Sequence, residues 1–326
     1  MTYFLRCVLM TFSLCGGAWA SPSFTLPTGF SAKSFQTSDQ VRLQFYESSG
    51  TAAAAASATT EGKTAAVSGS SSPTIIFIPG WTMPGAIWFE QAAKLSKNYR
   101  VLVLDPRGQG KSQVPENGYT YARRAADIAD LIAHCKCRQV LLIGWSLGGL
   151  ETLQYVADFK AANLAGIVLV DHSVGTGAPP KAMDPSLFQK IRSDQRAAMA
   201  GFSRSMFKVK PPQPWLDQLI QATLTMSGAN SIALLSQPTP REFWRDTFLK
   251  APVPILYAVI PRFAEQAQIM KAARPDIRIE IFENAGHALF IDDAQGFNRA
   301  LSDFARAISD GIALPSQDKQ GPVTSK

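Results

Sequence analysis

The chain has 326 residues, of which 46% are hydrophobic and 17% charged, and its formal net charge is +7. This balance excludes a disordered, collagen-like or multi-span membrane protein and is ordinary for a folded domain. The length suits one large α/β domain with an insertion, or two domains. A small positive charge spread over the whole surface predicts only weak attraction to anions, and we expect no nucleic-acid partner.

The first twenty residues are typical of a secretory signal peptide. Arg6 is their only charged residue, an apolar run at 7–14 follows, and A-W-A at 18–20 supplies small residues at the cleavage positions. The apolar run is too short to span a bilayer. We therefore expect residues 1–20 to be removed and the mature protein to be exported, periplasmic or secreted, with no membrane span.

Export would leave Cys135 and Cys137 as the cysteines of the mature chain. A C-x-C pair with the adjacent His134 cannot surround a metal ion, so we predict no metal site. In an oxidising compartment the two thiols either form a short, strained disulfide or remain reduced, and the sequence leaves both open.

After the signal peptide, residues 34–47 predict a hairpin, because apolar and polar residues alternate on both sides of a polar turn. Residues 51–72 are rich in Ala, Ser, Thr and Gly and are predicted to be a flexible insertion. Short apolar runs then alternate with amphipathic stretches, which predicts a mostly parallel sheet with helices on both faces. The expected strands are 74–78, 101–104, 140–143, 167–170, 255–259 and 277–282, and the expected helices include 86–97, 121–134 and 147–159.

The segment 175–250 breaks this alternation. It has helix-like pieces rich in Phe, Met and Trp, and it carries ten basic and five acidic residues, an excess that we interpret as a solvated face. We predict a helical cap inserted between two parts of a core, 21–174 and 251–314, with a flexible tail at 315–326.

The run G-Q-G-K-S at 108–112 does not predict nucleotide binding. A P-loop requires a second glycine five residues before Gly110, and Asp105 stands there. No G-x-G-x-x-G follows the first central strand either. We therefore expect no nucleotide cofactor.

The motif G-W-S-L-G at 144–148 lies between an expected strand and an expected helix. In G-x-S-x-G the serine sits on a sharp strand-to-helix turn, and its hydroxyl projects above the edge of the sheet. A serine hydroxyl becomes a nucleophile only when a base takes its proton. We predict Ser146 as the nucleophile and His287 as the base, because His287 follows the last expected strand and so lies at the same sheet edge. His134 precedes the strand of Ser146, at the opposite edge.

The oxyanion of an acyl-transfer intermediate needs two backbone N–H donors. Leu147 supplies one directly after the serine, and we predict Trp81, in the P-G-W-T loop after the first central strand, as the other. Trp81, Trp145 and parts of the cap are expected to line the pocket, so Trp145 is a predicted substrate-binding residue. The cap residues Met199, Phe202, Met206, Phe207 and Trp215 either share this pocket or form the cap's own core.

These features together resemble the α/β-hydrolase superfamily, most of all carboxylesterases of the pimeloyl methyl ester esterase-like branch. The resemblance covers about 35–310 apart from the cap and the insertion. It departs at Pro79, where that branch often has His, so the oxyanion hole must rely on backbone groups. The matching segments are I-I-F-I-P-G-W at 75–81, D-P-R-G-Q-G-K-S at 105–112, G-W-S-L-G-G at 144–149 and A-G-H-A-L-F at 285–290.

The resemblance offers two places for the acid that would orient His287. In much of the superfamily an Asp follows the next-to-last strand, but here Arg262 stands there and Glu265 follows it. In other members the acid follows the preceding strand, where Asp171 comes directly after 167–170. We predict Asp171, with Glu265 as the alternative. His172 is expected to lie in the cleft or on the surface.

The resemblance implies an α/β-hydrolase fold and a serine hydrolase that cleaves a small carboxylic ester through an acyl-enzyme, with no metal or organic cofactor. Lactone or amide hydrolysis and cofactor-free perhydrolysis stay open, because the same core supports each. Haloalkane dehalogenases and epoxide hydrolases carry Asp at the position of Ser146 and are disfavoured. A catalytically silent protein that binds a small apolar ligand is the alternative from a different class.

Overall fold

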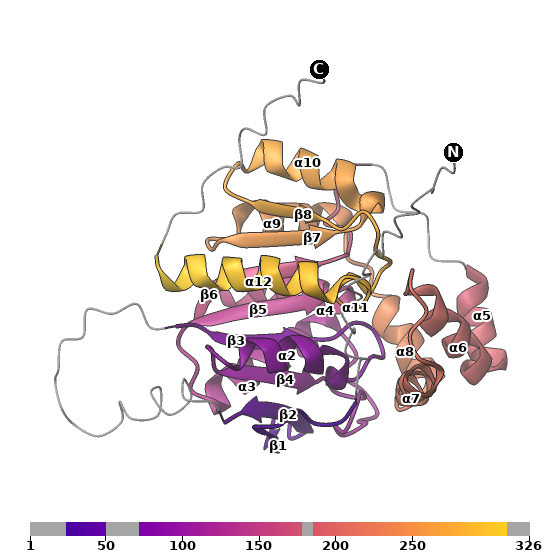
Figure 1. Cartoon of the computed structure of the whole chain (residues 1–326). Coiled ribbons are helices and arrows are strands. Elements are labelled where there is room, and N and C mark those ends of the chain that lie inside the picture. Colours follow the sequence, from indigo (N-terminus) through magenta and orange to yellow (C-terminus); the bar gives the residue numbers. More distant parts are fainter. Residues whose placement is uncertain (1–23, 50–71, 178–184, 312–326) are drawn as a thin grey trace, which may run out of the picture.

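The computed structural model describes residues 24–49, 72–177 and 185–311. The expected signal peptide, the 51–72 insertion up to residue 71 and the 315–326 tail lie outside these ranges. Within them the chain has the predicted fold class, a mostly parallel sheet covered by helices on both faces with helices inserted beside it (Figure 1).

The described strands form one eight-stranded sheet in the order β1-β2-β4-β3-β5-β6-β7-β8. β1 and β2 are the predicted hairpin, β2 also pairs antiparallel with β4, and the remaining neighbours are parallel. β3, β4, β5 and β7 are buried along their whole length, as expected for parallel strands between two helical layers. The strands are β1 Phe30–Gln36, β2 Arg42–Ser48, β3 Thr74–Ile78, β4 Val101–Asp105, β5 Val140–Trp145, β6 Leu164–Val170, β7 Ile255–Val259 and β8 Arg278–Ile281.

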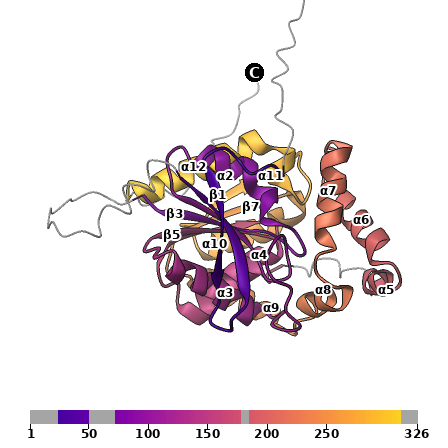
Figure 2. The same cartoon turned by 90° about the horizontal axis from the view of Figure 1, so that it is seen from below.

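Each face of the sheet has its own hydrophobic core. Helices α2 and α12 cover one face, and α3, α4, α9 and α10 cover the other (Figure 2). The helices predicted at 121–134 and 147–159 match α3 and α4, whereas 86–97 is a short 3-10 turn, η2 Gly85–Trp88, followed by α2. The helices of the core are α2 Phe89–Leu95, α3 Tyr121–His134, α4 Leu147–Phe159, α9 Arg241–Lys250, η3 Pro261–Phe263, α10 Ala264–Ala273, α11 Leu289–Asp292 and α12 Ala294–Ser309.

The inserted helices stand at the end of the sheet where β5 leads into α4 (Figures 1 and 2). They are α5 Pro185–Ser193, α6 Gln195–Ser205, α7 Gln213–Thr223 and α8 Gly228–Leu235, and we call these four helices the cap. The prediction extended the cap to residue 250, but α9 packs against α4 in the core. The apolar face of α9 is buried against the core: Trp244 packs edge-on against Tyr121 of α3, and Phe248 packs against Tyr257 of β7.

Cys135 and Cys137, which follow α3, are free thiols in the structure, so it shows the reduced alternative. Cys137 is buried. The Arg100 guanidinium donates a hydrogen bond to the Cys135 carbonyl oxygen, and the same nitrogen lies 3.7 Å from the Cys137 Sγ.

Candidate active site

Ser146 occupies the sharp turn between β5 and α4. Its backbone has φ 54° and ψ −117°, a conformation that L residues rarely adopt and that persists only where the surroundings enforce it. Its N–H donates to the Val170 carbonyl oxygen at 2.8 Å. A Cβ on Gly144 would lie 2.2 Å from the Gly148 carbonyl oxygen, and one on Gly148 would lie 2.6 Å from that of Ile78. Only glycine fits at these two positions, which explains the G-x-S-x-G spacing.

His287 lies in the loop after β8 and connects the serine to a carboxylate. Its Nε2 is 2.9 Å from the Ser146 Oγ, and its Nδ1 is 2.6 Å from the Asp171 Oδ2. A carboxylate only accepts hydrogen bonds, so the Nδ1 carries the proton and the Nε2 is free to accept from the hydroxyl. The structure therefore brings together the three residues that the sequence singled out.

Asp171 follows β6 directly and is 1% exposed. Its backbone N–H donates to the Ala258 carbonyl oxygen, and its Oδ1 accepts from the Ile260 N–H at 3.1 Å. These contacts aim the other oxygen, Oδ2, at His287. Glu265, the alternative acid, is exposed in the first turn of α10, and it is Asp171 that contacts the imidazole.

The loop after β3 lies over the serine: a Cβ on Gly80 would be 3.3 Å from the Ser146 Cβ. Leu147 is the first residue of α4, where backbone N–H groups have no partner within the helix. In the part of the chain that the structure describes, neither the Trp81 nor the Leu147 N–H donates a hydrogen bond. Two unused donors beside the serine hydroxyl are what an oxyanion requires.

Gln109 holds this loop in place, which the sequence did not reveal. Its side-chain amide donates to the carbonyl oxygens of Gly80 (3.0 Å) and Met83 (2.6 Å), and its Oε1 accepts from Arg124 at 2.8 Å. Gln109 lies within the G-Q-G-K-S run that does not bind phosphate by sequence criteria. Its place in the D-P-R-G-Q-G-K-S segment that matches the superfamily could have indicated a role for Gln109. No local sequence pattern, however, predicts that its side-chain amide binds a loop nearly thirty residues earlier.

The two tryptophans have different surroundings from those expected. The Trp145 indole is 1% exposed, and its N–H donates to the His287 carbonyl oxygen at 2.9 Å. It therefore holds the backbone of the His287 loop and has almost no surface to offer a substrate, which corrects the predicted substrate-binding role. The Trp81 indole is also buried and donates to the Ser231 carbonyl oxygen in α8, so it joins the loop to the cap.

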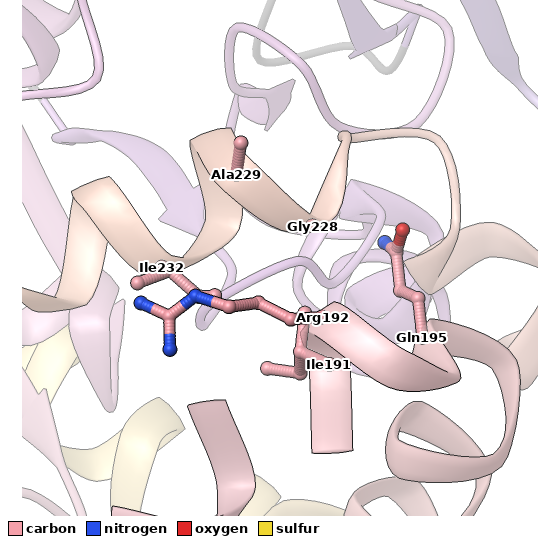
Figure 3. A pocket seen from close by; sticks show the side chains of 6 residues that line it. All are labelled: Ile191, Arg192, Gln195, Gly228, Ala229 and Ile232. Carbon is pink, nitrogen blue, oxygen red and sulfur yellow. The ribbon is translucent and has the colours of Figure 1, made fainter. Parts of the chain in front are cut away.

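The sequence left open whether the apolar cap residues form the core of the cap or line the pocket, and the structure shows that they differ in burial. Met199, Met206 and Trp215 are buried, whereas Phe202 is half-buried and packs edge-on against Trp81. A separate hollow of about 610 Å³ lies within the cap between α5, α6 and α8 (Figure 3). None of its lining residues comes from the loops that carry Ser146, Asp171 or His287. They are Ile191, Arg192, Gln195, Gly228, Ala229 and Ile232.

His172 is buried rather than on the surface or in a cleft. It is 6% exposed, its Nδ1 lies 3.0 Å from the Ser173 carbonyl oxygen, and its Nε2 has no partner among the described residues. Burial lowers the pKa of His172 to about 4. The ring therefore stays neutral at pH 7 and leaves the adjacent Asp171 carboxylate to His287.

This buried imidazole predicts a loss of stability on acidification. In the unfolded chain a histidine titrates near pH 6.5, so between about pH 6.5 and 4 only the unfolded state gains a proton from this residue. At pH 5 this protonation stabilises the unfolded state by about 2 kcal/mol, at about 1.4 kcal/mol for each pKa unit, and so lowers the free energy of unfolding by that amount. The non-titrating variant His172→Gln should lose less unfolding free energy than wild type between pH 7.5 and 5, as measured by urea unfolding. Equal pH slopes in the two proteins would contradict a buried, neutral His172.

A comparison with known proteins agrees with this architecture. The sequence profile described as the alpha/beta hydrolase family matches residues 75–300. The chain belongs to this family. The hydrolase is 26% identical over 252 residues to a pimeloyl-acyl-carrier-protein methyl ester esterase of Vibrio cholerae, covering 71% of this chain and 93% of that one. It is 24% identical over 255 residues to a non-heme chloroperoxidase of Kitasatospora aureofaciens, covering 71% and 91%.

Solved structures support the fold in the same way. An esterase from Exiguobacterium antarcticum superposes with a TM-score of 0.68 at 22% identity, covering 84% of the hydrolase and 99% of that chain. No helix in the described ranges of the hydrolase is long and apolar enough to cross a membrane.

Proposed function

We propose that this hydrolase is a serine esterase in which Ser146 attacks the carbonyl carbon of a small carboxylic ester. The observation that carries the proposal is the continuous chain from the Ser146 Oγ through both nitrogens of His287 to the Asp171 carboxylate. A hydroxyl, an imidazole and a buried carboxylate in this order activate a serine for acyl transfer.

In the acylation step, the His287 Nε2 takes the hydroxyl proton as the Ser146 oxygen bonds to the carbonyl carbon. Asp171 holds the imidazole in the tautomer with its proton on Nδ1 and stabilises the imidazolium that forms. The carbonyl oxygen becomes an oxyanion and accepts hydrogen bonds from the unused N–H groups of Trp81 and Leu147. Gln109 helps to hold the Trp81 N–H in position, because its amide donates to the Gly80 carbonyl oxygen, which belongs to the same peptide group, and to that of Met83.

Acylation is complete when His287 gives its proton to the leaving alcohol oxygen as the carbon–oxygen bond breaks. The acyl group remains on Ser146, and His287 then removes a proton from a water molecule that attacks the acyl carbon. His287 then gives that proton to the Ser146 oxygen as the bond between this oxygen and the acyl carbon breaks, which releases the carboxylic acid and restores the Ser146 hydroxyl.

A perhydrolase activity is a second candidate, because one of the relatives is named a non-heme chloroperoxidase. Hydrogen peroxide would replace water as the acceptor of the acyl group, giving a peracid and the free Ser146 hydroxyl. The same acyl-enzyme serves both reactions, so the two differ only in which molecule reaches the acyl carbon.

A substrate panel tests the proposed function. The purified protein would be assayed on p-nitrophenyl esters from acetate to dodecanoate, on acyl lactones and on anilides, and with acetate plus hydrogen peroxide for peracid. We expect turnover of at least one ester, with a preference for one range of acyl length. A folded protein with no turnover across the whole panel would contradict the proposal and favour the silent ligand-binding alternative.

We also propose that the hydrolase is exported. The n-region, apolar run and A-W-A triplet at the start of the sequence support cleavage after Ala20. Mass spectrometry of the protein from its native host should give an N-terminus at Ser21, in the periplasmic or extracellular fraction. A cytoplasmic chain that still begins at Met1 would contradict export.

A further inference from the structure

The Asp292 carboxylate at the end of α11 accepts hydrogen bonds from three backbone N–H groups, one in the loop just before α11 and two in a segment more than eighty residues earlier. Its Oδ2 accepts from Gly286 at 2.7 Å and from Lys208 at 2.8 Å, and its Oδ1 accepts from Val209 at 3.0 Å. Asp292 is 7% exposed. Hydrogen bonds from N–H groups to an ionised, buried carboxylate are about twice as strong as those between neutral groups. The carboxylate therefore joins its two segments firmly.

The first segment is the loop of the proposed base. Gly286 directly precedes His287, and on the other side of His287 the Ala288 N–H donates to the Met206 carbonyl oxygen at 3.0 Å. The His287 carbonyl oxygen itself accepts from Trp145. The N–H groups on either side of His287 are thus both held, that of Gly286 by Asp292 and that of Ala288 by Met206 at the end of α6.

The second segment is residues 206–212, which connect α6 to α7 and which we call the cap connector. It lies close against the loop of His287. A Cβ on Gly286 would be 2.7 Å from the Met206 carbonyl oxygen and 2.8 Å from the Lys208 nitrogen, so a side chain there would push the two segments apart. Lys208 also reaches the Glu283 carbonyl oxygen with its Nζ at 3.4 Å.

We propose that Asp292 is a positioning residue that makes the alignment of His287 depend on the docked cap connector. This inference rests on the proposed function, because it concerns the base of that reaction. Without the carboxylate, the loop keeps the bond between Ala288 and Met206 but loses the one that fixes Gly286, and the imidazole moves relative to Ser146. A displacement of about 1 Å at a reacting group is enough to cost about 10²-fold in rate.

The variant Asp292→Asn tests this with a matched control at the next position. The amide keeps the shape of the carboxylate but has only one acceptor oxygen, and its NH₂ group opposes at least one of the three N–H donors. Asp293→Asn is the control, because Asp293 caps α12 through Gly296 and asparagine caps a helix equally well. kcat and KM on the best ester of the panel would be measured together with the unfolding midpoint.

For Asp292→Asn we expect kcat to fall by about 10-fold to 10²-fold, with KM within about a factor of three, at a temperature where the protein is folded. The low-field proton signal of the His287 Nδ1–H, which reports its bond to Asp171, should shift or broaden. Asp293→Asn should keep kcat and this signal. An unchanged kcat and signal in folded Asp292→Asn would overturn the inference, and so would a loss of activity fully explained by unfolded protein.

A second variant perturbs the cap side of the same contact. Val209→Pro removes the N–H that donates to Asp292. Because the Val209 side chain is 61% exposed, the change removes no buried side chain. We expect a fall in kcat in the same direction and the same change in the Nδ1–H signal, and wild-type values for both would overturn the inference. If the native protein hydrolyses no ester at all, the proposed function fails, whereas normal native turnover with unaffected variants removes only the role of Asp292.

Discussion

Ser146→Ala and His287→Ala are each expected to lower kcat/KM for the best ester by at least about 10³-fold. Alanine at 146 removes the oxygen that forms the acyl-enzyme, and alanine at 287 leaves that oxygen without a base 2.9 Å away. The residual rate would come from substrate binding and the two N–H donors of Trp81 and Leu147. Initial rates of p-nitrophenol release at one pH measure both variants.

The double variant sharpens this test, because residues that act as one unit have effects that do not add. Ser146→Ala combined with His287→Ala should be about as slow as either single variant. His134→Ala is a matched control, since His134 is exposed at the end of α3 and packs against Phe35 and Phe45. Retention of more than about a tenth of the wild-type rate in either single variant would rule out the proposed mechanism.

Asp171→Asn is expected to lower kcat by up to about 10⁴-fold without disturbing the fold. An asparagine can turn its NH₂ group toward the His287 Nδ1, which then has to accept a hydrogen bond. The imidazole proton moves to Nε2, so the nitrogen that faces Ser146 can no longer take the hydroxyl proton. The other contact of Asp171, from the Ile260 N–H, can still be made to the amide oxygen.

Glu265→Gln is the matched control for this loss, because it makes the same carboxylate-to-amide change at the alternative position. Glu265 is exposed in the first turn of α10, and its variant should keep kcat within about a factor of two. Both variants need the same substrate and pH. Near-normal activity in Asp171→Asn together with an inactive Glu265→Gln would reverse the assignment of the acid.

The sequence was sufficient where the structure depends on local pattern. The central strands are short apolar runs between polar loops, and β3 and β7 have the bounds that their apolar runs predict. The turn at Ser146 is fixed by two glycines within five residues. The position of His287 followed from one topological rule, since loops after parallel strands emerge at the same sheet edge. The same rule places Asp171, which follows β6, at the edge of the sheet where His287 lies.

The sequence was insufficient where a side chain's partner lies far along the chain. Gln109 contacts the loop after β3, and Asp292 contacts a connector more than eighty residues earlier. Trp145 is the last residue of β5, and the sequence does not say whether its indole faces the cleft or the core; in the structure it is buried in the core. The end of the cap was misplaced because α9 is amphipathic like the cap helices, and only its packing on α4 assigns it to the core.

Covalent labelling of the native protein by a fluorophosphonate probe, followed by peptide mapping, measures most directly whether Ser146 is an activated nucleophile. The phosphonate phosphorus reacts with a serine oxygen that has lost its proton to a base, and fluoride leaves. We predict one adduct, on Ser146, that is absent from Ser146→Ala and forms far more slowly in His287→Ala. A folded native protein that remains unlabelled, or that is labelled at another residue, would contradict the proposed serine hydrolase mechanism.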